Sequence, residues 1–383
     1  MKIAITARVA FTPVEAIENA VVIVEDGRIL SVGPRSAIEI PTGAHFIELG
    51  DSILSPGFIE IHIHGGAGHD LMDLSRDGLA RFERHLTNYG VTSYCPTTVT
   101  APLDVTFKAL GWLTEAKSFT SDRSRAKPLG LHLEGPFLSH AKRGVHPPEN
   151  LLEPSPGMFE KFWQAAQGNV AMMTIAPELP GALATIKLAA SRNVCVSLGH
   201  SNATLQETKL GIDSGGSHAT HTFNAMRALD HREPGILGEV LYNDNVSADI
   251  IADGVHVHPE MVSLFLRAKG RDSAVLITDA LSATGMGDGK FRLGAFEVEV
   301  KGDRCTANGI LAGSVLTLDR AVRNIRKFTS WPLQHVIQLA TLNPARALGH
   351  KDIGLISPGA KADFVVLNSD GEVQRTILGD FIE

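Results

Sequence analysis

The feature that most constrains the fold is a series of eight apolar segments between residues 54 and 280, separated by helical stretches. Short apolar runs of this kind are typical of strands buried on both faces, joined by crossover helices. The segments are GFIEIHIHG from Gly57, VTSYCPTTV from Val91, PLGLHLEGP from Pro128, VAMMTIAPE from Val170, VCVSLGHS from Val194, SHATHTFNA from Ser217, VSADIIADG from Val246 and AVLITDA from Ala274. Eight parallel strands predict an α/β fold with a closed (β/α)8 TIM-like barrel.

The two ends of the chain have a different pattern from the barrel. The first fifty residues alternate short β-type runs with turns, and residues 354–381 return to short strands and turns. We expect these ends to pair as a small β-sandwich domain, formed by residues 1–53 and 349–383, beside a catalytic barrel domain of residues 54–348. Two separate extensions are the alternative.

The segment after the eighth strand carries three further predicted elements. Residues 282–312 are rich in glycine and alternating apolar residues, which predicts a β-hairpin insertion. Residues 315–328 and 333–348 carry apolar residues at three- and four-residue intervals, so each predicts an amphipathic helix.

Charge and composition narrow the class of partner. The formal charge of -7 provides no basic field that would recruit nucleic acid or an anionic membrane, so we expect a small-molecule ligand. The three cysteines are odd in number and widely spaced, and neither a leader nor an apolar run long enough to cross a bilayer is evident. These features favour a cytoplasmic protein.

His62 and His64 are the first candidates for a metal site. They lie two residues apart in an apolar run, so their side chains share one face of a strand, and imidazole is a common metal ligand. A pair of surface histidines is the alternative. The position decides between them, because these residues end the first barrel strand, at the edge where barrel active sites lie.

Further candidate ligands end other predicted strands. Glu134 ends the third strand, where a buried acid needs a cation or a hydrogen-bond donor, and His200 and His221 follow the fifth and sixth strands. His132 shares the face of Glu134, and we favour a supporting or packed role for it over a ligand role. Nitrogen and oxygen ligands converging on one rim predict a divalent metal, with zinc favoured over iron, manganese or cobalt.

Asp279 closes the eighth strand in ITDA. Its carboxylate could bind the metal, cap the next segment, or act as a general base. We favour the base, because hydrolysis of an unactivated amide requires a group that takes a proton from water and returns it to the leaving amine.

The ordered series of motifs resembles one family over essentially the whole chain. The motifs are HIHGG, HLEGPF, SLGHS, HTFNAM, IIADGVH, ITDA and NGILAGS, between an SPGFIEIH entry and the closing ATLNPARALG and PGAKADFVVL. In this order they resemble the N-acetylglucosamine-6-phosphate deacetylases of the amidohydrolase superfamily. The resemblance implies an amidohydrolase-type barrel that converts N-acetylglucosamine 6-phosphate to glucosamine 6-phosphate and acetate in amino-sugar catabolism.

The resemblance also implies roles for single residues. Glu134, His200 and His221 would hold the main metal, His62 and His64 would allow a second metal with Glu134 as the bridge, and Asp279 would be the catalytic acid and base. The implied substrate-binding residues are Val145, His146, Asn224, Ala225, Arg232, His256, Leu311, Ala312 and Gly313. Since the phosphate-facing arginine of this family can come from the partner subunit, a homodimer is implied.

Two alternative functions remain at this point. The first is another amidohydrolase, dihydroorotase-like or dipeptidase-like, that acts on an amide without a phosphate. The second is a non-catalytic barrel stabilised by a metal, which the acid at Asp279 argues against, because a structural metal site needs no base.

Overall fold

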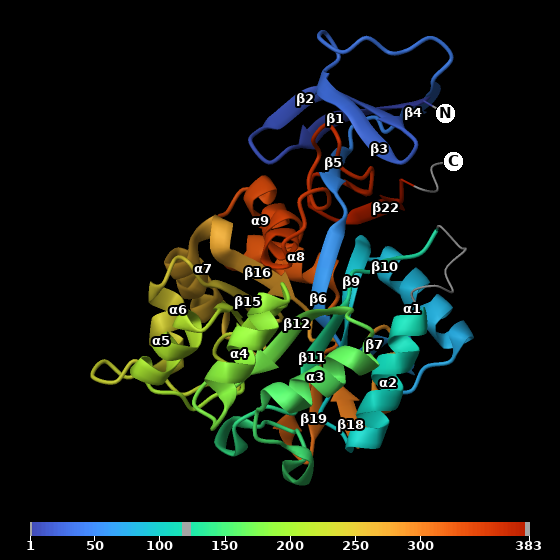
Figure 1. Ribbon diagram of the computed structural model, residues 1–383. Coiled ribbons are helices and arrows are strands. Elements are labelled where there is room, and N and C mark those ends of the chain that lie inside the picture. The colour runs from blue at the N-terminus through green and yellow to red at the C-terminus, as the bar shows by residue number, and fades with distance from the viewer. Residues whose placement is uncertain (1, 117–123, 380–383) are drawn as a thin grey trace.

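The protein, described by a computed structural model over residues 2–116 and 124–379, is built around an eight-stranded parallel barrel (Figure 1). All eight predicted strands form. They are β6 (Phe58–Ile63), β9 (Val91–Thr98), β11 (Leu131–Glu134), β12 (Val170–Ile175), β13 (Cys195–Leu198), β14 (Gly216–Ala219), β15 (Ser247–Ile251) and β16 (Ala274–Ile277). The short β10 (Lys127–Pro128) pairs with β9, and the predicted fold class is confirmed.

The barrel closes between its first and last strands through Glu60. The two carboxylate oxygens of Glu60 accept hydrogen bonds from the main-chain N–H groups of His62 and Thr278, each at 3.0 Å. Beyond this clasp, the N–H of Asp279 donates to the carbonyl of His62 at 3.0 Å. Burial raises the pKa of Glu60 to about 8, and the seam that Glu60 closes holds His62 and Asp279 side by side.

Helices surround the barrel and are placed by the connections between strands (Figure 1). Several begin at a capping side chain: Ser75 and Ser155 accept from main-chain N–H groups, and Thr204 with Glu207 forms a capping box. The helices are α1 (Arg76–Thr87), α2 (Leu103–Ala116), α3 (Pro156–Ala165), α4 (Ala182–Ser191), α5 (Leu205–Asp213), α6 (Gly235–Tyr242), α7 (Pro259–Ser273), α8 (Leu318–Phe328), α9 (Leu333–Leu339) and α10 (Leu342–Ala347), with 3-10 turns at His140–Lys142 and Pro148–Asn150. Within the described residues, none of these helices is long and apolar enough to span a bilayer.

Strands from both ends of the chain join one seven-stranded sheet, as expected from the sequence. Its central link is β5, which pairs with the first strand on one side and with β21 on the other. The strands are β1 (Lys2–Phe11), β2 (Ala16–Glu25), β3 (Arg28–Pro34), β4 (His45–Glu48), β5 (Ile53–Pro56), β21 (Phe364–Leu367) and β22 (Val373–Ile377). Side chains from all seven strands, including Ile5, Val22 and Phe364, pack into one apolar cluster.

The residue bounds expected for the two domains stay a prediction. The terminal sheet extends to Pro56, three residues past the expected limit at 53. Residue 1 and residues 380–383, which the expected small domain includes, lie outside the described residues.

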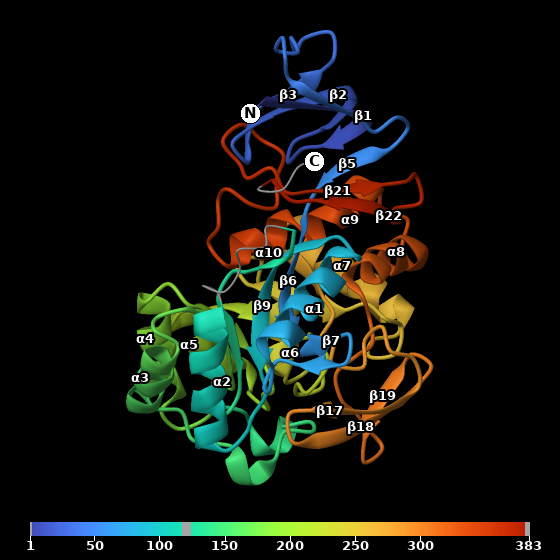
Figure 2. The ribbon, with the colours of Figure 1, turned by 90° about the vertical axis from the view of Figure 1, so that its right-hand side faces the viewer.

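The insertion after the eighth strand is a four-stranded antiparallel sheet, so the expectation of a single hairpin was wrong. It consists of β17 (Gly289–Leu293), β18 (Phe296–Lys301), β19 (Arg304–Ala307) and β20 (Ile310–Leu311). The last two strands have four and two residues, too short for their alternation to stand out in the sequence. Figure 2 shows the terminal sheet at one end of the molecule and this insertion near the other, beside the rim where the barrel strands end. A two-stranded β7–β8 ribbon (Gly65–Gly66 and His69–Asp70) follows β6.

Candidate metal centre and active site

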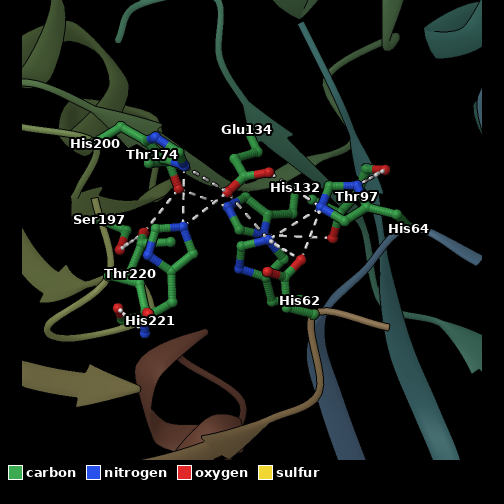
Figure 3. Close-up of polar contacts among 12 residues, drawn as sticks. His62, His64, Thr97, His132, Glu134, Thr174, Ser197, His200, Thr220 and His221 are labelled. Carbon is green, nitrogen blue, oxygen red and sulfur yellow. Dashed lines mark hydrogen bonds and ion pairs between the residues drawn. The ribbon is translucent and has the colours of Figure 1, made fainter. Parts of the chain in front are cut away.

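Six side chains converge at the carboxyl ends of the barrel strands, and all six were candidates from the sequence. His62 lies in β6 and His64 follows it, Glu134 is the last residue of β11, and His200 and His221 each lie two residues past a strand. Asp279 lies two residues past β16. Figure 3 shows the four histidine rings and the Glu134 carboxylate pointing toward one another.

Three of these residues leave their strands through a strained backbone. His200, His221 and Asp279 have φ angles of +47°, +32° and +51°, in the left-handed region that side chains with a Cβ rarely adopt. Each such residue costs about 1 to 3 kcal/mol, and the surrounding structure must hold it in place. Three of the six converging residues thus have a strained backbone.

The first group of ligand atoms contains Glu134, His200 and His221. Glu134 Oε1 lies 3.3 Å from His200 Nε2 and 3.2 Å from His221 Nε2, and the two Nε2 atoms are 3.0 Å apart. Donor atoms arranged tetrahedrally about zinc, at about 2.1 Å from it, stand about 3.4 Å from one another. The three atoms therefore have close to the spacing that a small divalent cation requires.

The second group contains His62, His64 and Asp279. Asp279 Oδ1 lies 3.2 Å from His64 Nε2 and 3.6 Å from His62 Nε2. Glu134 reaches this group as well, because its Oε2 lies 3.0 Å from His64 Nε2. Its Oε1, which contacts His200 and His221, also lies 3.3 Å from His62 Nε2, so the Glu134 carboxylate contacts both groups.

The electrostatics of the cluster favour positive charge. Burial raises the pKa of Glu134, but the neighbouring imidazoles of His62, His200 and His221 outweigh it and hold that pKa well below its usual range. Burial lowers the pKa of His64, yet Asp279 and Glu134 raise it to about 10, and Glu134 likewise raises the pKa of His221 to about 9. Two buried carboxylates therefore stabilise any cation placed among the four imidazoles, which fits a divalent metal.

Main-chain carbonyls orient two of the candidate ligands. The Nδ1 atom of His200 lies 2.8 Å from the carbonyl oxygen of Lys142, and that of His64 lies 3.3 Å from the carbonyl oxygen of Thr97. A carbonyl only accepts, so each Nδ1 carries a proton, and Nε2 is the ring nitrogen that would bind a cation.

His132 does not share this role. Its Nδ1 lies 3.1 Å from the carbonyl oxygen of Ile61 and its Nε2 lies 2.8 Å from Thr174 Oγ1, so both ring nitrogens already have partners. Its ring packs edge-on against His62, with ring centroids 4.6 Å apart. It supports the position of His62 from below, in line with the role favoured from the sequence.

A cavity of about 310 Å³ opens above the cluster. Eight of the nine residues predicted to bind substrate line it: Val145, His146, Asn224, Ala225, His256, Leu311, Ala312 and Gly313. The exception is Arg232, which is exposed in the segment between β14 and α6. A larger hollow of about 800 Å³ lies beside α2 and the insertion, but none of the six ligand candidates lines it.

The segment that carries Asn224 and Ala225 has an unusual backbone conformation. Positive φ angles alternate along it, at His221, Phe223 and Ala225. Alternation between right- and left-handed residues turns successive main-chain N–H groups toward a common concavity. The N–H of Asn224 already has a main-chain partner, since it donates to the carbonyl of His221 at 2.9 Å.

Two aspartates on and after β15 support the site and were not recognised from the sequence. Asp249 lies 3.0 Å from His218 Nε2 and also accepts from the main-chain N–H of His221, which fixes the strained turn there. Asp253 Oδ2 lies 2.6 Å from His256 Nδ1. Burial raises the pKa of Asp253, but His256 outweighs it and lowers that pKa. Their position inside the otherwise apolar segment VSADIIADG is the sequence signal by which these two aspartates could have been identified.

Comparison with known proteins places these observations in a family. The model of the amidohydrolase family matches residues 53–380. The N-acetylglucosamine-6-phosphate deacetylase of Lysinibacillus sphaericus is 35% identical over 360 residues, which cover 92% of this chain and 90% of that protein. The N-acetylgalactosamine-6-phosphate deacetylase of Escherichia coli O157:H7 is 39% identical over 345 residues, 90% of each chain.

Solved structures agree with these relatives. An N-acetyl-D-glucosamine-6-phosphate deacetylase variant from Mycobacterium smegmatis, in complex with N-acetyl-D-glucosamine-6-phosphate, superposes with a TM-score of 0.92 at 32% identity and covers 99% of this chain and 98% of its own. The enzyme from Pasteurella multocida gives a TM-score of 0.92 at 30% identity, with the same coverage. The resemblance to N-acetylglucosamine-6-phosphate deacetylases is confirmed. The chain belongs to the amidohydrolase family, whose members are metal-dependent hydrolases.

Proposed function

We propose that this protein removes the acetyl group from N-acetylglucosamine 6-phosphate, yielding glucosamine 6-phosphate and acetate, as a step of amino-sugar catabolism. The observation that carries the proposal is the convergence of four imidazoles and two carboxylates on one rim, at the base of a cavity. The relatives that match most of the chain support the choice of substrate, since they are named for this reaction or its galacto counterpart.

Glu134, His200 and His221 are proposed to hold the principal divalent cation. His62 and His64, with Glu134 as the bridge, are proposed to hold a second. Nitrogen and oxygen donors at near-tetrahedral spacing support zinc over iron, manganese or cobalt. When bound, the cation supplies Lewis acidity, which lowers the pKa of water and polarises a carbonyl group.

Asp279 is proposed to move the proton. Burial raises its pKa, but His62 and His64 outweigh this and hold that pKa below its ordinary value, so the carboxylate is ionised and can accept a proton at neutral pH. It takes the proton from the attacking water and delivers it to the departing sugar amine, which cannot leave as an anion.

The phosphate is proposed to bind at the turn around Asn224 and Ala225, with His256 and Arg232 supplying positive charge. Val145, His146 and the Leu311–Gly313 stretch are proposed to surround the sugar and its acetamido group. Because Arg232 is exposed and does not line the cavity of its own chain, its proposed role supports a homodimer in which the partner receives this arginine. Phosphorylated substrates and three unpaired, buried cysteines support a cytoplasmic location.

The test is acetate release by the zinc-loaded protein from three sugars: N-acetylglucosamine 6-phosphate, N-acetylgalactosamine 6-phosphate and unphosphorylated N-acetylglucosamine. We expect the first to have the highest kcat/KM and the third the lowest. A chelator should abolish the activity and added zinc should restore it. Preference for the galacto sugar would move the assignment to the activity of the Escherichia coli relative, and no dependence on phosphate would point to another amidohydrolase reaction.

A further inference from the structure

His146 lies in the cavity beside the candidate metal ligands but has a different set of contacts. It is buried, its ring packs edge-on against that of His200 with centroids 4.8 Å apart, and its Nε2 lies 3.7 Å from Glu134 Oε2. Its Nδ1 contacts Thr100, a buried residue just after β9. The Oγ1 of Thr100 lies 2.7 Å from this nitrogen, and the main-chain N–H of Thr100 donates to it at 3.4 Å.

These contacts decide where His146 carries its proton. A main-chain N–H can only donate, so the Nδ1 that faces it must accept. A proton on Nδ1, in the other neutral tautomer or in the imidazolium, would point at the Thr100 N–H. The ring is therefore neutral, with its single proton on Nε2, and the Thr100 hydroxyl donates to the same Nδ1.

His200 and His64 have the opposite arrangement. Main-chain carbonyls face their Nδ1 atoms, which places the proton on Nδ1 and leaves Nε2 as an electron-pair donor. The same residue type thus offers lone pairs to a cation at two positions and an N–H to the cavity at a third. The group that contacts Nδ1 determines which ring nitrogen carries the proton.

We propose that Thr100 is a positioning residue that fixes His146 as a neutral Nε2–H donor to the carbonyl oxygen of the scissile amide. The proposal rests on the proposed function and deepens it. Negative charge accumulates on that oxygen when water attacks, and a donor already in place stabilises the charge without reorganisation. A histidine with the lone pair on Nε2 would repel the same oxygen.

The Thr100 side chain is held tightly enough for this task. Gly135, at φ +85°, follows Glu134, and a Cβ built there would lie 2.1 Å from Thr100 Oγ1. The absence of a side chain at Gly135 lets the hydroxyl fit between the β11 turn and the His146 ring. Thr100 thereby links the placement of His146 to the strand that carries Glu134.

The first experiment reads the tautomer directly in the zinc-loaded protein, without substrate. Long-range ¹H–¹⁵N correlation spectra of histidine-labelled protein distinguish a protonated from a bare ring nitrogen, and loss of one spin system in His146→Gln assigns the residue. We expect a protonated Nε2 and a bare Nδ1 for His146. A proton on its Nδ1 would overturn the proposal, whatever reaction the protein catalyses.

The second experiment measures the effect on turnover. Thr100→Val keeps the shape and the main-chain N–H, and so the tautomer, but removes the 2.7 Å hydrogen bond that holds the His146 ring in place. The kcat for N-acetylglucosamine 6-phosphate should therefore fall about 10- to 100-fold while KM stays within about twofold. Thr100→Ser restores the hydroxyl and should recover kcat to within about threefold of the wild type. Thr92→Val, the same change at a buried threonine at the other end of β9, should leave kcat unchanged.

A rise in KM at constant kcat, or a serine variant as slow as the valine variant, would refute the role of Thr100. If the wild-type protein releases no acetate, the proposed function fails. The spectra alone then confirm or refute the tautomer expected for His146.

Discussion

The side chain of Asp253 fixes the orientation of His256. Asp253 Oδ1 accepts from the main-chain N–H groups of Val255 and His256, each at 2.8 Å, and its Oδ2 contacts His256 Nδ1. A carboxylate on Nδ1 holds the imidazole, which lines the cavity, in one orientation. This fixed orientation supports the phosphate-binding role proposed for His256.

Replacing Asp253 by asparagine should weaken binding of the phosphate. The amide cannot make the charge-assisted contact with Nδ1 that holds the ring, so KM for N-acetylglucosamine 6-phosphate should rise about 5- to 20-fold while kcat changes less than about twofold, a loss of about 1 to 2 kcal/mol. Steady-state kinetics check this, with Asp213→Asn, an exposed aspartate at the end of α5, as the matched control. An unchanged KM would exclude Asp253 from phosphate binding.

The six ligand candidates could be predicted because each lies at the end of an apolar strand, where burying a polar side chain is costly unless it has a partner. Thr100, Asp249 and Asp253 could not be given roles, since each acts through a histidine whose position depends on the folded barrel. Threonine in CPTTVT is an ordinary residue for a strand, and only its contact with His146 gives it a function.

At the scale of elements, the eight strands were predictable because crossover helices separate apolar runs of almost uniform character. Boundaries were less certain: the stretch predicted as one helix over 333–348 is α9 followed by α10, divided at Ala340 and Thr341. The packing between helices was not visible in the sequence. Lys269 of α7 is an example, since it is buried and its Nζ donates to the carbonyls of Val240 and Asn243, at the end of α6.

Lys269 should make stability depend on pH. Burial lowers its pKa from 10.5 to about 8, so between these values the unfolded chain binds more protons than the folded one, and stability rises with pH. The urea midpoint of the wild type minus that of Lys269→Met should therefore increase from pH 7.5 to pH 10. Lys187→Met, at an exposed position on α4, serves as the control. A difference that shrinks or stays constant over this interval would show that α7 does not bury a charged amine here.

At the scale of the whole molecule, the barrel lies between the sheet formed by the chain ends and the rim that carries the candidate site. The terminal sheet lies at one end and the β17–β20 insertion near the other (Figure 2). The cavity is lined by residues of the insertion together with candidate ligands at the carboxyl ends of the barrel strands. Leu311, Ala312 and Gly313, at the end of the insertion, line the cavity next to His64 after β6, Glu134 of β11 and the turn after β14. The site thus requires segments more than 200 residues apart in sequence. The ordered motifs predicted this convergence. The hydrogen bonds by which Glu60 joins the first and last barrel strands were visible only in the structure.

The most direct test of the account is turnover by Asp279→Asn, measured together with its zinc content. The account holds that Glu134, His200 and His221 hold the principal cation while Asp279 moves the proton. Zinc per chain should equal that of the wild type, and kcat for acetate release should fall by about 10²- to 10⁴-fold, because asparagine cannot accept a proton. An asparagine variant with full zinc content and near-wild-type turnover would contradict the account.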